Sequence, residues 1–131
     1  MGVADGVGGW AEHGVDPGIY SRLLCTNVKN IHERNNRNDK FEAEYKKSLR
    51  DIIIEAADVT QVQGSSTLVL ALLDPKENVL HTANFGDSGY ILLRREGDEI
   101  KTVFRSKEMQ KSFNFPYQLG YKRNGDDPSV S

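Results

Sequence analysis

Apolar residues in the first quarter of the chain recur every three to four positions, the period of an amphipathic helix. The apolar stripe consists of Tyr20, Leu24, Val28 and Ile31. Asp16 is a suitable N-cap, and Pro17 fits the first helical position. We therefore predict a helix over residues 17–33 and a polar loop over residues 35–38.

A second helical stripe follows, made of Phe41, Tyr45, Leu49, Ile52, Ile53 and Ala56. Asp39 and Glu42 have the spacing of a capping box, which marks a helix start. The opposite face carries charges of both signs, which is typical of a solvated surface. This pattern predicts a helix over residues 40–58.

Strands are predicted for most of the second half of the chain. Residues 68–73 are apolar at every position, so we expect this strand to be covered on both faces. Residues 74–78 have turn composition. The other expected strands are residues 2–5, 79–85, 89–95 and 99–105, the last three forming an antiparallel meander.

Two amphipathic helices combined with several strands predict an α+β fold, with two antiparallel sheets and helices outside them. We expect one domain over residues 1–120, in which residues 106–120 are irregular surface chain. Residues 121–131 form a polar tail that we expect to be mobile.

Composition excludes some classes of partner. The net charge of −2 argues against a nucleic-acid partner, and no apolar run is long enough for a membrane span. Cys25 is the only cysteine and is expected to be a small core or boundary residue. His13 and His32 are expected to be surface or capping residues, and His81 to pack or hydrogen-bond within the meander.

Candidate chemistry begins at residues 3–10, with the sequence VADGVGGW. Asp5 ends a short apolar run and supplies a hard oxygen, which suits Mg²⁺ or Mn²⁺. The glycines that follow let the backbone approach a charged ligand. Two other interpretations are a tight turn after an edge strand and an anion-binding glycine loop. The second lacks the Lys-Ser/Thr ending of a phosphate loop.

A second apolar strand, residues 80–90, contains Gly-Asp-Ser-Gly around Asp87. With VADGVGGW, it resembles the metal-dependent serine/threonine protein phosphatases of type 2C, in the mitochondrial branch of that family. Three further stretches carry the same resemblance: AEHGVDPGIYSRLLC, QGSSTLVLALLD and FNFPYQLG. The resemblance covers most of the chain.

The resemblance implies an αββα sandwich that hydrolyses phosphoserine or phosphothreonine in proteins, using water held between two Mg²⁺ or Mn²⁺ ions. It makes Asp5 the bridging carboxylate and catalytic residue, and Gly6 a metal ligand through its carbonyl. It gives Asp87 a part in a third, weaker metal position, although Gly-Asp-Ser is also good turn chemistry. It also implies a mitochondrial location.

The sequence departs from the family pattern in ways that limit the expected activity. Val7 stands where many members have a histidine proposed as general acid. The later metal carboxylates, the phosphate-binding arginine and an acidic pair are missing. Met1 stands where a sheet should be under way, so we expect a truncated central piece of the domain, inactive or nearly so and prone to self-association. The alternative is a non-catalytic module that binds a protein partner.

Overall fold

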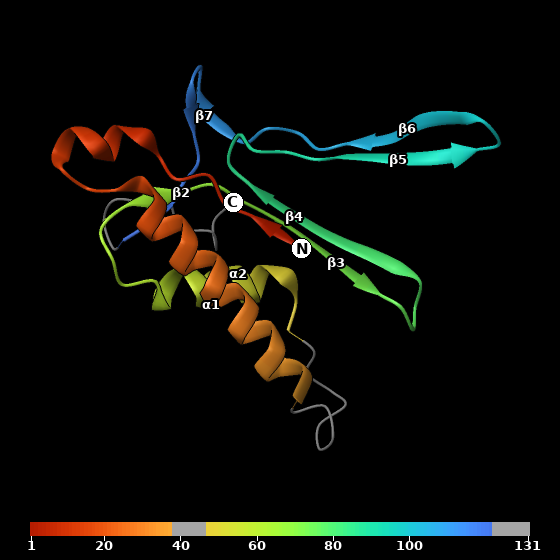
Figure 1. Ribbon diagram of the computed structural model, residues 1–131, viewed down its shortest axis with the longest axis horizontal. Helices are drawn as coiled ribbons and strands as arrows, with labels where there is room; N and C mark the ends of the chain where they lie inside the picture. Colours follow the sequence, from red (N-terminus) through yellow and green to blue (C-terminus); the bar gives the residue numbers. More distant parts are fainter. Residues whose placement is uncertain (38–46, 122–131) are drawn as a thin grey trace.

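The computed structural model describes residues 1–37 and 47–121. In that part of the chain, two α-helices lie on one side of a small antiparallel sheet, and a long hairpin extends away from them (Figure 1). The helical elements are the 3₁₀ helix η1 (Gly8–His13), α1 (Pro17–Arg37) and α2 (Leu49–Val59). The strands are β1 (Gly2–Val3), β2 (Ser65–Ser66), β3 (Leu68–Asp74), β4 (Val79–Phe85), β5 (Ile91–Glu96), β6 (Glu99–Arg105), β7 (Gln110–Ser112), β8 (Phe115–Pro116) and β9 (Leu119–Gly120).

The sheet that organises the molecule has the strand order β1-β3-β4 and is antiparallel throughout. Val3 lies opposite Val69, and the β3–β4 pair runs in register from Leu68 opposite Phe85 to the turn. The predicted turn at residues 74–78 is confirmed. Asp74 accepts hydrogen bonds from the backbone N–H groups of the two residues after Pro75, at 3.0 and 3.3 Å.

The core lies between the helices and this sheet. Its buried apolar side chains are Tyr20, Leu24, Ile31, Ile52, Ile53, Ala56, Leu68, Leu70, Phe85 and Leu119. All four stripe positions predicted for the first helix belong to this core or pack against it, so the prediction for residues 17–33 is confirmed. The predicted double coverage of residues 68–73 is correct only for the first half, because Leu73 is 64% exposed.

The helix α1 continues past the predicted loop, so that prediction is wrong for residues 35–37. Asparagine is a weak helix breaker, and local side-chain pairs support the last turn. Asn36 Nδ2 lies 3.1 Å from His32 Nε2, and Arg37 forms an i,i+4 ion pair with Glu33 at 3.8 Å. Residue 38 lies outside the described residues.

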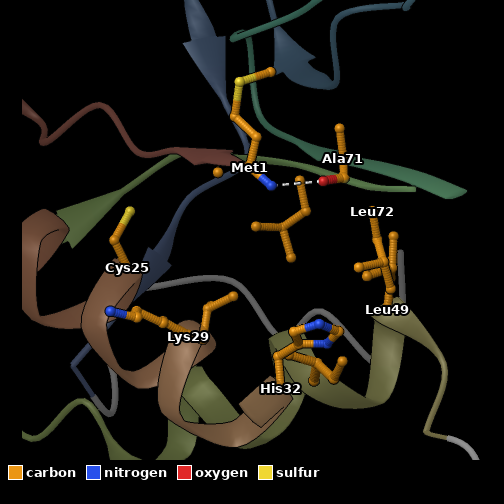
Figure 2. Close-up of a pocket in the computed structure, with 11 residues that line it drawn as sticks. Met1, Cys25, Lys29, His32, Leu49, Ala71 and Leu72 are labelled. Atoms are coloured by element: carbon orange, nitrogen blue, oxygen red, sulfur yellow. Dashed lines mark hydrogen bonds between the residues drawn. The ribbon is translucent and has the colours of Figure 1, made fainter. Parts of the chain in front are cut away.

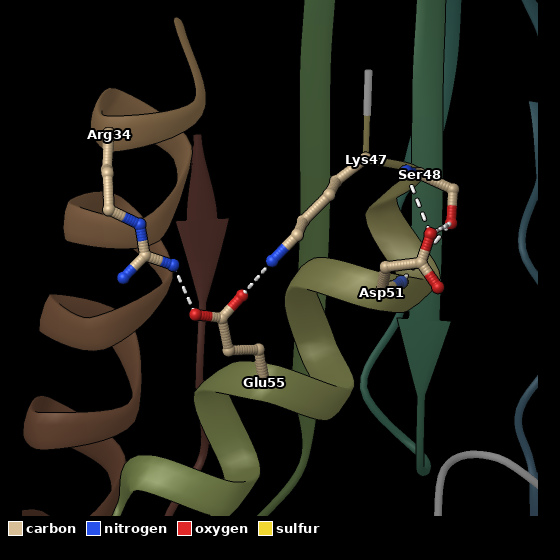
Figure 3. Close-up of polar contacts among 5 residues, drawn as sticks. All are labelled: Arg34, Lys47, Ser48, Asp51 and Glu55. Carbon is tan, nitrogen blue, oxygen red and sulfur yellow. Dashed lines mark hydrogen bonds and ion pairs between the residues drawn. The ribbon is translucent and has the colours of Figure 1, made fainter. Parts of the chain in front are cut away.

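The second helix begins at Leu49, later than the predicted residue 40, because Ser48 caps it (Figure 3). Ser48 Oγ accepts the N–H of Asp51 at 3.2 Å, and the Asp51 carboxylate accepts the N–H of Ser48 at 3.2 Å. The Asp51 carboxylate also accepts a hydrogen bond from the Ser48 hydroxyl at 2.8 Å, and this bond, followed by the one from the Ser48 N–H, holds the pKa of Asp51 below its usual range. The predicted start, including Asp39, lies outside the described residues.

Glu55 joins the two helices in an ion-pair network (Figure 3). Its carboxylate accepts hydrogen bonds from Lys47, just before α2, and from Arg34 on α1. These two bonds, the Lys47 bond foremost, lower the pKa of Glu55. The network fixes the end of α1 against α2 at the helix surface.

The predicted meander is correct for the hairpin of residues 89–95 and 99–105 and wrong for the step before it, because β4 and β5 do not pair. In the described residues β4 pairs with β3, and β5 pairs with β6 in a separate two-stranded sheet. β4 ends at Phe85, Gly86 has φ +105°, and β5 begins only at Ile91. His81, predicted to pack there, is exposed. Residues 106–120 are also less irregular than predicted: β7 pairs with β8, and β9 pairs with β2.

The predicted α+β fold with antiparallel sheets is confirmed. No helix within the described ranges is long and apolar enough to cross a membrane. The domain boundary at residue 120 stays a prediction, since residues 122–131, the predicted tail, lie outside the described part of the chain.

Candidate metal centre

Asp5 is held in place by its backbone and presents its side chain to solvent. Its carbonyl accepts the N–H of Thr67 at 3.0 Å, and Val7 donates its N–H to the carbonyl of Ser65 at 3.0 Å. The chain therefore continues the sheet pairing for one more step beyond β1, with Gly6 opposite Ser66. Asp5 itself is exposed.

Gly6 and Ser66 form a non-hydrogen-bonded antiparallel pair, because the hydrogen bonds on either side are made by the residues that flank them. The Gly6 carbonyl takes no part in the backbone bonds of the described residues and points away from Ser66. A Cβ atom at this position would collide with the carbonyl of Pro17 at the start of α1. Glycine is therefore needed for the loop to pass the helix, which also leaves one backbone oxygen available beside Asp5.

Asp87 lies in a second tight loop, directly after β4. Gly86 has φ +105°, and an added Cβ would lie 2.6 Å from Thr67 Cγ2 and 2.7 Å from the carbonyl of Tyr117. The Gly86 carbonyl accepts the N–H of Met109 at 2.8 Å. The loop is thus anchored on both sides, while Asp87 is exposed.

Thr67 connects the two acidic loops. Its N–H donates to the carbonyl of Asp5, and its Oγ1 lies 2.6 Å from Ser88 Oγ. Leu68 pairs with Phe85, so the segments holding Asp5 and Asp87 leave β1 and β4 at the same end of the sheet, on either side of β3. The backbone segments that carry Asp5 and Asp87 are therefore fixed at one end of the sheet by a shared, 3% exposed threonine.

A hydrogen-bond chain fixes the glycine-rich loop after Gly6. Trp10 Nε1 donates to Ser65 Oγ at 2.8 Å, and Ser65 Oγ donates to Gln118 Oε1 at 2.9 Å. These bonds join η1, β2 and the segment before β9. Sequence reasoning used the stretches that contain Ser65, Thr67 and Gln118 only for family resemblance and gave these residues no role. A signal was present: a Ser-Ser-Thr run enters a fully apolar strand.

The described residues fit part of a site for a hard divalent cation. Asp5, Gly6 and Asp87 offer carboxylate and carbonyl oxygens, the donors that Mg²⁺ and Mn²⁺ prefer. However, no three His, Cys, Asp or Glu side chains within residues 1–37 and 47–121 are grouped to hold a metal. Since Mg²⁺ takes about six oxygens, these three residues by themselves do not complete such a site.

The histidines and Cys25 lie away from these loops. His13 is exposed, as predicted, with its ring 6.3 Å from that of Trp10. His32 is half-buried and lines an apolar cavity of about 330 Å³ between the helices and the sheet, so its prediction as a surface residue is wrong in part (Figure 2). Cys25 lines the same cavity, and burial raises the pKa of its thiol, in accord with a boundary residue.

Comparison with known proteins identifies the class. No protein-family model matches the sequence. The chain is 43% identical over 129 residues to the probable protein phosphatase 2C 55 of Arabidopsis thaliana, covering 98% of the chain and 25% of that relative. It is 36% identical over 124 residues to the protein phosphatase PTC7 homolog of Xenopus laevis, covering 91% of the chain and 38% of that relative.

The X-ray structure of the photosystem II phosphatase PBCP has the same fold, with a TM-score of 0.78 and 29% identity. The match covers 98% of this chain and 46% of that one. These similarities place the chain in the type 2C protein phosphatase family. Within it, the chain is similar to the PTC7 homologs, of which it spans about two fifths or less.

Proposed function

We propose that this chain contributes the Asp5–Gly6 and Asp87 part of the active site of a metal-dependent serine/threonine protein phosphatase. The observation that carries the proposal is the Thr67 link, which fixes both acidic loops at one end of the sheet. A plain turn after an edge strand does not need a second acidic loop bonded to it. The similarity to type 2C phosphatases supports the same assignment.

In this proposal each residue acts through its position. Asp5 would hold two Mg²⁺ or Mn²⁺ ions through its carboxylate, Gly6 would offer its carbonyl oxygen to one of them, and Asp87 would contribute to a third, weaker position. When bound, the ions supply an activated water and neutralise charge on the phosphoryl oxygens. Val7 has no side-chain proton to donate, so the general-acid role at this position is vacant or filled by water.

The substrate class is a protein that carries phosphoserine or phosphothreonine. Asp5 and Asp87 are exposed, so a phosphorylated side chain on a polypeptide can reach them. We propose a mitochondrial location, because the motifs match that branch and PTC7 homologs are among the relatives. The fold by itself does not set the compartment, since the structural neighbour is a photosystem II phosphatase.

The experiment measures Mn²⁺-dependent hydrolysis of a phosphothreonine peptide. The 131-residue chain alone should show negligible turnover, because the groups of one catalytic unit act together. A chain extended at both ends to the length of the relatives should be active, lose activity in EDTA, and lose most of it with Asp5→Ala. Metal-dependent turnover that Asp5→Ala leaves unchanged would overturn the assignment.

A second candidate function, a non-catalytic module that binds a protein, is favoured by the apolar surface of hairpin β5–β6. The side chains of Leu93, Ile100 and Phe104 are 62%, 69% and 47% exposed. An isolated two-stranded sheet is only marginally stable, and exposed apolar side chains on it are typical of an interaction surface. We propose that this surface makes the chain self-associate. Hydrolysis requires Mn²⁺ and is lost in Asp5→Ala. Partner binding by the module requires no Mn²⁺ and survives this substitution.

A further inference from the structure

The strongest unassigned feature is a cavity of about 420 Å³ beside the Asp87 loop. One wall is formed by Asp87, Tyr90 and Ile91, and the other by Arg105, Ser106 and Glu108. The volume is within the range that small ligands and peptide side chains occupy in proteins. Because Asp87 itself lines it, anything bound here lies next to the proposed metal centre.

The walls of this cavity are fastened together by hydrogen bonds. The backbone N–H of Tyr90 donates to Ser106 Oγ at 2.9 Å, and the N–H of Ser106 donates to the Tyr90 carbonyl at 3.0 Å. The Tyr90 hydroxyl lies 2.6 Å from Thr82 Oγ1 on β4. Asn84 Nδ2 donates to the carbonyl of Lys107 at 3.0 Å, which holds the Arg105 side of the cavity to β4. The cavity is therefore largely formed before any ligand arrives.

The cavity has one cationic group. The backbone of Arg105 pairs with Ile91 in the hairpin, but its side chain makes no ion pair or hydrogen bond with the other described residues and is exposed. The two acids of the cavity, unlike Arg105, each have a partner. Glu108 accepts a hydrogen bond from Gln110 at 3.1 Å, and Asp87 binds metal under the proposed function. A guanidinium with free donors is suited to a carboxylate or a phosphate, which it can bind in a bidentate manner.

We infer that Arg105 is a specificity-determining residue that binds an anionic side chain flanking the phosphorylated residue of the substrate. This inference rests on the proposed function, because the cavity gains its meaning from the adjacent metal centre. The anion is a carboxylate or a second phosphate on the same polypeptide. The preferred substrates are therefore phosphoproteins with acidic or multiply phosphorylated sequences around the target serine or threonine.

The test measures peptide binding to the 131-residue chain in Mn²⁺ by fluorescence anisotropy. Four peptides share one sequence: a phosphothreonine flanked by glutamates, by glutamines or by a second phosphothreonine, and the glutamate peptide without phosphate. Arg105→Gln removes the charge, and Arg105→Lys keeps it. Arg94→Gln is the matched control, since Arg94 is an exposed arginine of the same hairpin that does not line the cavity.

Arg105→Gln should weaken binding of the anionic peptides roughly three- to tenfold and leave the glutamine peptide unchanged. Arg105→Lys should restore part of the loss, and Arg94→Gln should have no effect. The larger loss, with glutamate or with the second phosphate, identifies the anion. Equal losses with Arg94→Gln, or an equal loss for the glutamine peptide, would overturn the inference.

Failure of the proposed function gives a different result. In that case Mn²⁺ and Asp87→Asn have no effect on any phosphopeptide. The anion site would still be established if Arg105→Gln weakened binding of the glutamate peptides, with and without phosphate, and left binding of the glutamine peptide unchanged.

Discussion

Gly86 provides the sharpest test of how the Asp87 loop is built. It combines a φ of +105° with close packing: an added methyl group would lie 2.6 Å from Thr67 Cγ2 and 2.7 Å from the Tyr117 carbonyl. Gly86→Ala therefore introduces backbone strain and a steric clash together. The clash is against Thr67, the residue that links both acidic loops.

A control substitution at Gly97 separates the two contributions to the lost stability, backbone strain and steric clash. Gly97, in the β5–β6 turn, has φ +62° and no atom within 4 Å of an added Cβ. Gly97→Ala should cost about 1–2 kcal/mol, the strain of a left-handed conformation alone. At Gly86, strain of about 1–3 kcal/mol and overpacking of about 1–3 kcal/mol combine to about 2–6 kcal/mol. That total is a large fraction of the stability of an ordinary domain.

Urea unfolding followed by the fluorescence of Trp10, the sole tryptophan, measures both variants. Trp10 is bonded to Ser65, two residues before Thr67, so its signal reports on this region. The free energy of unfolding should fall at least 1 kcal/mol further for Gly86→Ala than for Gly97→Ala. Equal losses in the two variants would refute the packing of Gly86 against Thr67.

Three further predictions concern stability and association. Glu55→Gln should lower the free energy of unfolding by about 0.5–2 kcal/mol at pH 7. Because its two cationic partners lower the pKa of Glu55, this difference should persist above about pH 4.3, the unfolded value, and disappear in chemical unfolding as the pH falls through the lower folded value. Leu68→Ala, in a fully buried position, should cost about 2–5 kcal/mol, whereas Leu73→Ala, 64% exposed, should cost under about 1 kcal/mol in the same unfolding measurement. Replacing Leu93 and Phe104 by lysine should reduce self-association in light scattering; an unchanged particle mass above that of the monomer would place the contact elsewhere.

Element type could be predicted from the sequence better than pairing could. The apolar stripe of α1 has the helical period and fits no other element, and the predicted helix was correct. The start of α2 was misplaced although a signal existed, since Ser48 and Asp51 have capping-box spacing just as Asp39 and Glu42 do. Strand pairing was harder to predict, because the composition of residues 79–85 and 91–96 indicates strands without indicating their partners. In the structure these strands pair with β3 and β6 and not with each other.

The proposed site shows a similar division. Asp5 and Asp87 could be selected from the sequence because each acid is flanked by glycine after an apolar run. The residue that holds them together, Thr67, could not. Its role depends on the end of the sheet, where Asp5 and Asp87 come to lie on either side of β3 only when β1, β3 and β4 are in register. The cavity at Arg105 was missed for the same reason, since its walls come from two loops that the β5–β6 hairpin brings together.

The most direct test of the central claim is a calorimetric Mn²⁺ titration of the 131-residue chain and three variants. Asp5→Asn should remove most of the binding heat, and Asp87→Asn should remove a smaller part. Asp98→Asn, an exposed acid in the hairpin turn, should change nothing. Mn²⁺ binding of equal strength in the Asp5→Asn variant and the unaltered chain would contradict the assignment of this end of the sheet as a metal centre.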